Sequence, residues 1–304
     1  MKPETQAAPR IIAPISGHPL KIGSGFTATS FREADFTGAM DPLVMVDHYR
    51  MKESTFGAHP HAGLSAVSVL FEDSSGKFHN RDSLGNSIDL LPGDLYWLKA
   101  GSGAVHDEAP REGARIHGLQ VFVNLPARMK RDTPDSLHVK ATDVPVLETD
   151  DYRVRIVLGE SNSVSGATSP AQPMTILDGQ LRANSAFTHE TASGENVWVY
   201  AIEGDLDLTI ESGHSTQEVR LKAGESIAIE ASRSADLSNS DLRDGGNTSI
   251  RLRSGTSSGA HFALFAATPL NEAFVQKGPF VMNNKAEITE VEARYAGVNL
   301  DSMI

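Results

Sequence analysis

The chain consists of short apolar segments separated by turn-forming residues. It has 26 Gly and 15 Pro among 304 residues, and long stretches with helical periodicity are rare. Apolar runs of four to eight residues bounded by Gly, Pro, Asn or Asp are typical of strands in a β-sandwich or β-barrel. The sequence therefore predicts an all-β fold.

Eight segments have the clearest strand pattern, since they are rich in Val, Ile, Leu and aromatic residues. These are residues 65–71, 94–98, 117–125, 153–158, 197–202, 205–210, 226–229 and 261–266. One helix is expected over residues 285–295, where Asn284 can cap the first turn and Ile288, Val291 and Tyr295 recur at helical spacing. Residues 159–171 and 232–249 are dense in Ser, Asn, Asp and Gly and are expected to be loops.

An internal repeat suggests two related halves. In the first half, Glu72 ends an apolar run, and Gly93 follows 21 positions later, before an acidic residue and another apolar run. Glu203 and Gly224 repeat this layout with the same spacing, at an offset of 131 residues. At a prior of about 150 residues per domain, we expect two tandem β-barrel domains, residues 1–150 and 151–304.

The charge balance excludes some classes of partner. The chain has 27 Lys plus Arg against 39 Asp plus Glu, a net charge of −12 at pH 7. Direct binding to nucleic acid or to an anionic membrane surface needs a basic footprint, which the sequence lacks. Residues 1–14 have no apolar core of a secretory signal, and no run approaches the ~20 apolar residues of a membrane span. We expect a cytoplasmic protein with no membrane or nucleic-acid partner.

The chain has no cysteine, and this restricts its chemistry. Disulfides, thiolate zinc sites, iron–sulfur clusters and cysteine nucleophiles are all excluded. Any metal ion must be held by nitrogen and oxygen ligands. The 11 histidines are therefore the main candidate ligands.

Two pairs of residues are spaced to form a metal site. His59 and His61 flank Pro60, and in an extended chain residues i and i+2 point to the same face. His106 and Glu108 form a second such pair, 45 residues after His61. Each pair alone favours an exposed polar turn, and only the two pairs together, in a chain whose repeat predicts a barrel, favour a metal site. Together, inside a barrel, they would supply three nitrogens and one carboxylate oxygen to a single metal.

This donor set suits one divalent transition metal, and iron, manganese, cobalt, nickel, copper and zinc all remain open. Four protein ligands leave two positions of an octahedron for water, dioxygen or a chelating substrate. Glu108 could also act as a base. Moving the four ligands by 131 residues gives Glu190, Ala192, Leu237 and Asn239, so the second half is expected to hold no metal.

The remaining histidines are assigned no metal. We expect His18, His138 and His214 at the surface and His48, His117 and His261 in the core or in hydrogen bonds, whereas His79 and His189 are undecided.

Several motifs resemble the pirin family. They are HPHAG at 59–63, RDSLGN at 81–86, PGD at 92–94, the segment 100–108 that ends in VHDE, GLQVFVNLPA at 118–127 and GPFVMN at 278–283. The resemblance spans about residues 41–283 and is thinner over 159–258. Four positions depart from the usual family pattern and could line the pocket: Ser65, Asn80, Lys99 and Ser102.

The resemblance implies a bicupin, two tandem jelly-roll-like cupin barrels with a short C-terminal helix. It places one mononuclear metal, typically iron as Fe(II), on His59, His61, His106 and Glu108 of the first barrel, and it weakly favours a monomer. Pirin-like proteins include quercetin 2,3-dioxygenases, for which the partners are a flavonol and dioxygen, with Glu108 as the catalytic base here. Others are non-enzymatic, redox-responsive regulators that bind a protein partner. The sequence leaves both functions open.

Overall fold

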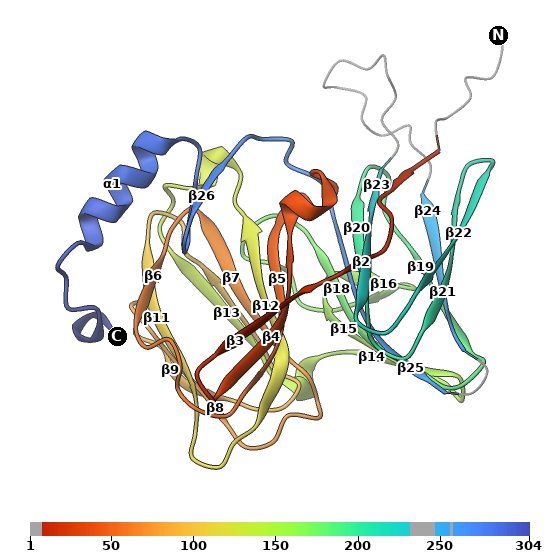
Figure 1. Ribbon diagram of the computed structural model, residues 1–304, viewed down its shortest axis with the longest axis horizontal. Helices are drawn as coiled ribbons and strands as arrows, with labels where there is room; N and C mark the ends of the chain where they lie inside the picture. Colours follow the sequence, from red (N-terminus) through yellow and green to blue (C-terminus); the bar gives the residue numbers. More distant parts are fainter. Residues whose placement is uncertain (1–7, 232–246, 256–257) are drawn as a thin grey trace, which may run out of the picture.

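Two β-barrels lie side by side in the computed structural model, which describes residues 8–231, 247–255 and 258–304 (Figure 1). Each barrel is formed by one large and one four-stranded antiparallel sheet. The model therefore has the all-β, bicupin architecture that the sequence and the family resemblance predict. None of its helices, within the described ranges, is long and apolar enough to cross a membrane.

The first barrel combines a seven-stranded sheet, in the order β13-β10-β7-β12-β5-β4-β3, with a four-stranded sheet, in the order β6-β11-β8-β9. The strands of the large sheet are β3 (His18–Ile22), β4 (Phe26–Arg32), β5 (Leu43–Met51), β7 (Leu64–Leu70), β10 (Leu95–Lys99), β12 (Ile116–Asn124) and β13 (Asp135–Val139). Those of the small sheet are β6 (His59–His61), β8 (Phe78–Asp82), β9 (Ser87–Leu90) and β11 (Ala104–Pro110).

The second barrel repeats this arrangement. Its eight-stranded sheet has the order β1-β23-β20-β25-β18-β15-β14, with β2 also paired to β23, and its four-stranded sheet has the order β19-β24-β21-β22. The large sheet contains β1 (Arg10–Ile11), β2 (Ile15–Ser16), β14 (Val146–Glu148), β15 (Tyr152–Leu158), β18 (Thr175–Leu181), β20 (Asn196–Glu203), β23 (Glu225–Glu230) and β25 (Ala260–Ala267). The small sheet contains β19 (Ala186–Glu190), β21 (Leu206–Ser212), β22 (Ser215–Leu221) and β24 (Thr248–Ser254).

Shorter elements complete the described chain. Two hairpins are formed by β16 (Glu160–Ser161) with β17 (Val164–Ser165) and by β26 (Val275–Lys277) with β27 (Phe280–Met282). The one α-helix of the described residues is α1 (Lys285–Tyr295), and the 3-10 helices are η1 (Glu33–Phe36), η2 (Ala127–Met129), η3 (Ala141–Asp143) and η4 (Leu300–Met303).

The eight predicted strands are all confirmed, with ends that differ by at most two residues. The predicted helix is also confirmed, and the Asn284 side chain accepts a hydrogen bond from the amide of Glu287. The loop predicted over 159–171 is partly wrong, because it contains the hairpin β16–β17. Of the second predicted loop, residues 232–246 lie outside the described residues, and Thr248 already belongs to β24.

The two large sheets pack against each other through one apolar cluster. Val67 and Val69 of β7 contribute to it from the first barrel, and Trp198 and Tyr200 of β20 from the second. Phe31 of β4 contacts Trp198 with ring centroids 5.5 Å apart. Side chains alternate along a strand. Ala66, Ser68 and Leu70, which alternate with Val67 and Val69, therefore face the interior of the first barrel. That interior face positions the site described below.

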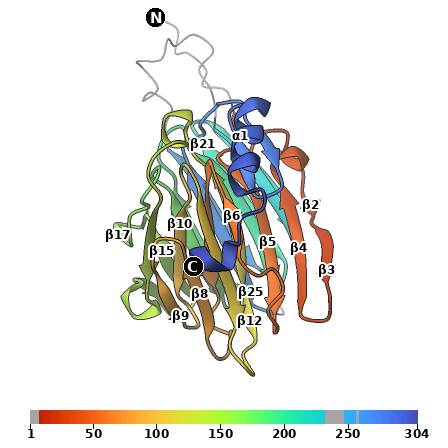
Figure 2. The ribbon, with the colours of Figure 1, turned by 90° about the vertical axis from the view of Figure 1, so that its left-hand side faces the viewer.

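Each end of the described chain packs on the opposite barrel. Near the beginning, β1 and β2 pair with β23 of the second barrel. Near the end, the hairpin β26–β27 and helix α1 lie on the first barrel (Figures 1 and 2). The division of the chain at residue 150 remains a prediction, and these crossing ends add contacts between the two halves.

The repeat of the sequence corresponds to equivalent strands over part of its length. An offset of 131 residues carries β7 onto β20 and β10 onto β23. It fails later, because β24 begins only at Thr248. Leu237 and Asn239, onto which His106 and Glu108 project, lie outside the described residues.

Candidate metal centre

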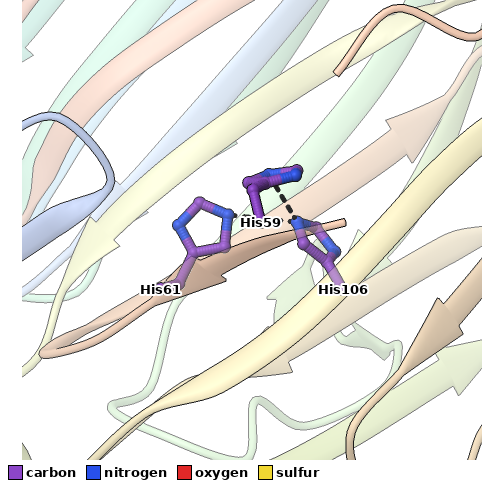
Figure 3. Close-up of side chains that lie close together, drawn as sticks. All are labelled: His59, His61 and His106. Carbon is purple, nitrogen blue, oxygen red and sulfur yellow. Dashed lines mark hydrogen bonds between the residues drawn. The ribbon is translucent and has the colours of Figure 1, made fainter. Parts of the chain in front are cut away.

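Three histidines of the first barrel converge from two neighbouring strands (Figure 3). His59 and His61 are the ends of β6, and His106 is in β11. The two strands are antiparallel, with His106 paired to His59 and Ala104 paired to His61. His61 and His106 are 1% and 2% exposed, whereas His59 is half-buried.

The distances between the ring nitrogens match those of ligands on one metal ion. The Nε2 atom of His106 is 3.0 Å from that of His61 and 3.1 Å from that of His59. Two nitrogens bound at about 2.1 Å and at right angles to each other are separated by about 3.0 Å. One candidate ligand nitrogen from each of the three residues lies within 4.8 Å of the others.

The outer nitrogens of two of these rings are held by backbone carbonyl groups. His59 Nδ1 lies 2.8 Å from the carbonyl oxygen of Gly57, and His61 Nδ1 lies 3.2 Å from that of Pro279. A carbonyl oxygen can only accept, so each Nδ1 carries the proton and each Nε2 has a free lone pair. A single proton on His106 Nε2 can make a straight hydrogen bond to only one of these lone pairs, whereas a metal ion between the three rings would accept all of them, and the residues present therefore fit a bound metal ion.

The electrostatic environment keeps the three rings neutral, as metal ligands must be. Burial and, to a smaller extent, the neighbouring His59 lower the pKa of His61 to about 3. Burial also lowers the pKa of His106 well below its usual value and lowers the pKa of His59. These neutral imidazoles offer lone pairs throughout the physiological pH range.

Glu108 is on the same face of β11 as His106 but lies outside the group of mutually close ligand atoms. Its Oε1 accepts a hydrogen bond of 2.7 Å from Ser68 Oγ of β7. Burial raises the pKa of Glu108, the hydrogen bond from Ser68 opposes this and the charge of Asp107 adds to it, which together give a pKa of about 7. The structure thus brings the three predicted histidines together, while the assignment of all four residues as ligands remains a prediction.

Further polar groups surround Glu108, and of these the sequence singled out only Asn80. Gln120 Oε1 lies 3.0 Å from Ser68 Oγ. Asn80 is cross-strand from Glu108, and its side chain has no hydrogen-bond partner among the described residues. The hydroxyl of Tyr49 is likewise buried and without a partner there. The alternation of side chains along β7 and β12 places Ser68 and Gln120 on one face of their strands. The sequence does not say that this face lies opposite Glu108 of β11.

Aromatic side chains adjoin the histidines. The ring of Phe122 is 5.0 Å from that of His61, and the ring of Phe56 is 6.2 Å from that of His59, measured between centroids. Phe56 is 51% exposed, so an apolar surface adjoins the half-buried His59.

The four departures from the family pattern differ in their positions. Asn80 adjoins Glu108, as described above. Ser65 has the strand parity of Val67 and Val69, which point to the interface between the barrels and not to the metal site. Lys99 is paired with Ser65. The carbonyl oxygen of Ser102 accepts a hydrogen bond from Arg294, in the last turn of α1.

The other histidines are mostly placed as expected. His48 bonds Tyr200 and His117, His117 also bonds Asp73, and His261 bonds Asp178. His18 and His214 are exposed, but His138 is half-buried and bonds Asp94, contrary to its predicted surface position. The two undecided residues are also paired, His79 with Asp89 and the buried His189 with Ser161.

Comparison with known proteins gives matches over both barrels. A family model described as Pirin matches residues 25–123, and one described as Pirin C-terminal cupin domain matches residues 176–300. Pirin of Rattus norvegicus is 30% identical over 252 residues, 83% of this chain and 79% of that protein. A Pseudomonas aeruginosa protein named "putative quercetin 2,3-dioxygenase" is 30% identical over 293 residues, 92% of this chain and 94% of that protein.

A solved structure has the same fold. The crystal structure of quercetin 2,3-dioxygenase from Acinetobacter baumannii superposes with a TM-score of 0.76 at 24% identity, and the match covers 98% of this chain and 100% of that one.

Proposed function

Because this chain belongs to the pirin family, we propose that it is a metal-dependent dioxygenase acting on a flavonol such as quercetin, or on another substrate with adjacent hydroxyl and carbonyl oxygens. The observation that carries the proposal is the convergence of three histidine nitrogens within ligand distance of one point. The Pseudomonas aeruginosa relative, similar over 92% of this chain, has a name that agrees with this activity.

We propose that His59, His61, His106 and Glu108 hold one metal ion, and that the ion is Fe(II). When bound, such an ion supplies a Lewis acid and a redox centre at which substrate and dioxygen can meet. The proposed enzyme acts as a monomer in the cytoplasm, and its net charge of −12 gives no support to a nucleic-acid or membrane partner.

Glu108 is the proposed general base for the substrate hydroxyl. Its buried carboxylate lies on the strand that carries His106, and Ser68 holds one of its oxygens. The other oxygen has no hydrogen bond to the described residues in the structure, so it is available to take a proton. Phe56 and Phe122, beside His59 and His61, offer apolar surface to a planar aromatic ring.

The test is metal analysis of the purified protein followed by dioxygen uptake with quercetin on the Fe(II) form. We expect uptake by the wild type and its loss in His59→Ala and Glu108→Ala. His189→Ala is the matched control, since His189 is a buried histidine of the second barrel. Full metal loading without uptake on any flavonol would instead support the non-enzymatic regulator that binds a protein partner.

A further inference from the structure

The last part of the chain packs directly on the strand that carries two of the candidate ligands. The amide of Val281 donates a hydrogen bond of 3.0 Å to the carbonyl oxygen of Ala62, which follows His61. Phe280 forms an isolated parallel bridge with the same residue. Figure 2 shows the segment from β26 to α1, called the C-terminal cover (residues 275–295), over the first barrel near β6.

The C-terminal cover also orients a candidate ligand. The carbonyl oxygen of Pro279 accepts from His61 Nδ1 at 3.2 Å, across 218 residues of sequence. This contact keeps the proton on Nδ1 and thus leaves the lone pair on Nε2, which faces His106. Removal of the cover would free the His61 ring to rotate and to change tautomer.

A buried lysine fastens the cover to the barrel. Lys130 is 1% exposed, and its Nζ donates to the carbonyl oxygens of Gly63 at 2.8 Å and Val281 at 2.9 Å. Its third hydrogen bond goes to the side-chain oxygen of Asn124. An ammonium group has three donors, and all three are used here, as the burial of a charge requires. Lys130 therefore joins the HPHAG segment, the NLPA segment and the GPFVMN segment of the sequence.

The backbone at Gly63 is shaped for this contact. Its φ is +72°, and a Cβ added there would lie 1.9 Å from the carbonyl oxygen of Val281. A side chain at this position would push the cover away from the barrel.

An apolar cluster separate from the cores of both barrels holds the rest of the cover in place. Its buried members are Ala62, Phe280, Met282, Ile288 and Val291. Ile288 and Val291 come from α1, so the helix is anchored on the residue next to His61.

We propose that docking of the C-terminal cover and metal binding at the three histidines are thermodynamically coupled, with Lys130 and the Pro279 carbonyl as positioning groups for His61. The inference rests on the proposed metal site but not on the proposed dioxygenase activity. Coupling is reciprocal, so a docked cover raises the affinity for metal and a bound metal stabilises docking by the same factor.

The first arm measures the affinity for Zn²⁺, a redox-inert probe, by chelator competition on the full-length protein. Ile288→Ala loosens the cover without touching a ligand, and Ile250→Ala removes the same atoms from the core of the second barrel. We expect affinity to fall about 10-fold or more in Ile288→Ala, the range typical for loss of partners that orient ligands, and to stay unchanged in Ile250→Ala. Equal losses of Zn²⁺ affinity in both variants would mean that the loss comes from general destabilisation of the protein. That result would overturn the coupling.

A second pair of variants tests the lysine itself. Lys130→Met keeps a side chain of similar length without the ammonium, and the exposed Lys140 supplies the control Lys140→Met. We expect Lys130→Met to lower Zn²⁺ affinity at least as much as Ile288→Ala does, and Lys140→Met to leave it unchanged. If Lys130→Met does not fold, the Ile288 pair still decides the question.

The second arm follows hydrogen exchange of the Val281 amide, which is bonded to Ala62, with and without Zn²⁺. Reciprocal coupling is supported if Zn²⁺ slows this exchange by about the same factor by which Ile288→Ala lowers the affinity for Zn²⁺. Identical exchange with and without bound Zn²⁺ contradicts it. Failure of the wild type to bind Zn²⁺ overturns the proposed metal site and the coupling together, whereas binding without dioxygen uptake contradicts only the proposed activity.

Discussion

Ser68 and Glu108 join the two sheets of the first barrel through a hydrogen bond of 2.7 Å from Ser68 Oγ to Glu108 Oε1. Ser68 belongs to β7 of the large sheet and Glu108 to β11 of the small sheet, and both side chains are buried. The carboxylate thus has a fixed partner on the strand opposite the histidines.

Ser68→Ala is expected to reduce dioxygen uptake with quercetin. Loss of a hydrogen bond to a charged group costs about 1.5–3 kcal/mol, which corresponds to roughly a 10- to 100-fold lower kcat/KM. Metal content should fall less than in a variant of the three histidines, which are untouched. Ser226→Ala, at a buried serine of the second barrel, is the control and should leave uptake unchanged. Wild-type uptake in Ser68→Ala would show that Glu108 needs no such support.

The metal content of ligand variants should separate the histidines from Glu108. We expect His106→Ala to lose most of the bound metal, because its Nε2 is within 3.1 Å of both other ligand nitrogens. Glu108→Gln should retain more metal than His106→Ala, since Glu108 is outside the close group. Elemental analysis of dialysed protein measures both, with His189→Ala as the control. Unchanged metal in His106→Ala would refute the ligand assignment.

Arg155→Met is expected to destabilise the fold by about 3–5 kcal/mol, because it removes one of the two basic partners, Arg155 and His261, of the buried Asp178 carboxylate. Arg155 is 2% exposed, its Nη1 is 2.9 Å from Asp178 Oδ2, and its Nη2 donates to the carbonyl oxygen of Gly93 in the other half. Urea denaturation measures the change in the free energy of unfolding. The exposed Arg253 supplies the control Arg253→Met, which should change it by less than about 0.5 kcal/mol. A similarly small change in Arg155→Met would contradict the prediction.

The stability should fall in acid partly through His48. Burial lowers the pKa of His48 to about 3, with smaller contributions from His117, Arg50 and His261. The folded protein therefore keeps this ring neutral, while the unfolded chain takes up a proton near pH 6.5. The stabilisation is complete above pH 6.5 and is lost as the pH falls from there toward 3.

His48→Gln cannot take up that proton, so its free energy of unfolding should depend less on pH. The difference in slope from the wild type should approach about 1.4 kcal/mol per pH unit below pH 6.5. Urea denaturation between pH 4 and 7 measures it. The histidines that do not interact with His48 are present in both proteins and cancel in this difference. Parallel pH profiles would mean that His48 does not titrate as described.

Much of the fold could be predicted because its signals are local. The apolar runs at 65–71 and 197–202 have the composition of buried strands, and both are strands in the structure. Asn284 caps α1 as its position before the helical pattern indicates. The repeat also gave the correct counterpart for β7, but it failed at β24, because an offset cannot anticipate additional residues between two strands.

The site was predictable to the extent that strand geometry is. The i, i+2 spacing of His59 and His61 places both rings on one side of an extended segment, whatever the rest of the chain does. The pairing of His106 with His59 depends on the register between β11 and β6, which the spacing of the histidines does not give. The bond from Ser68 to Glu108 requires that two sheets face each other, and no local pattern contains that information.

The sequence by itself determined the kinds of atoms available for the site, nitrogen and oxygen without sulfur, and the strands on which they stand. Only the tertiary structure decided that Pro279 orients His61 and that Lys130 joins Gly63 to Val281. The physical reason is the range of the forces involved. Backbone conformation and side-chain alternation depend on neighbouring residues, whereas contacts across 151 or 218 residues exist only after both sheets and the C-terminal cover have packed.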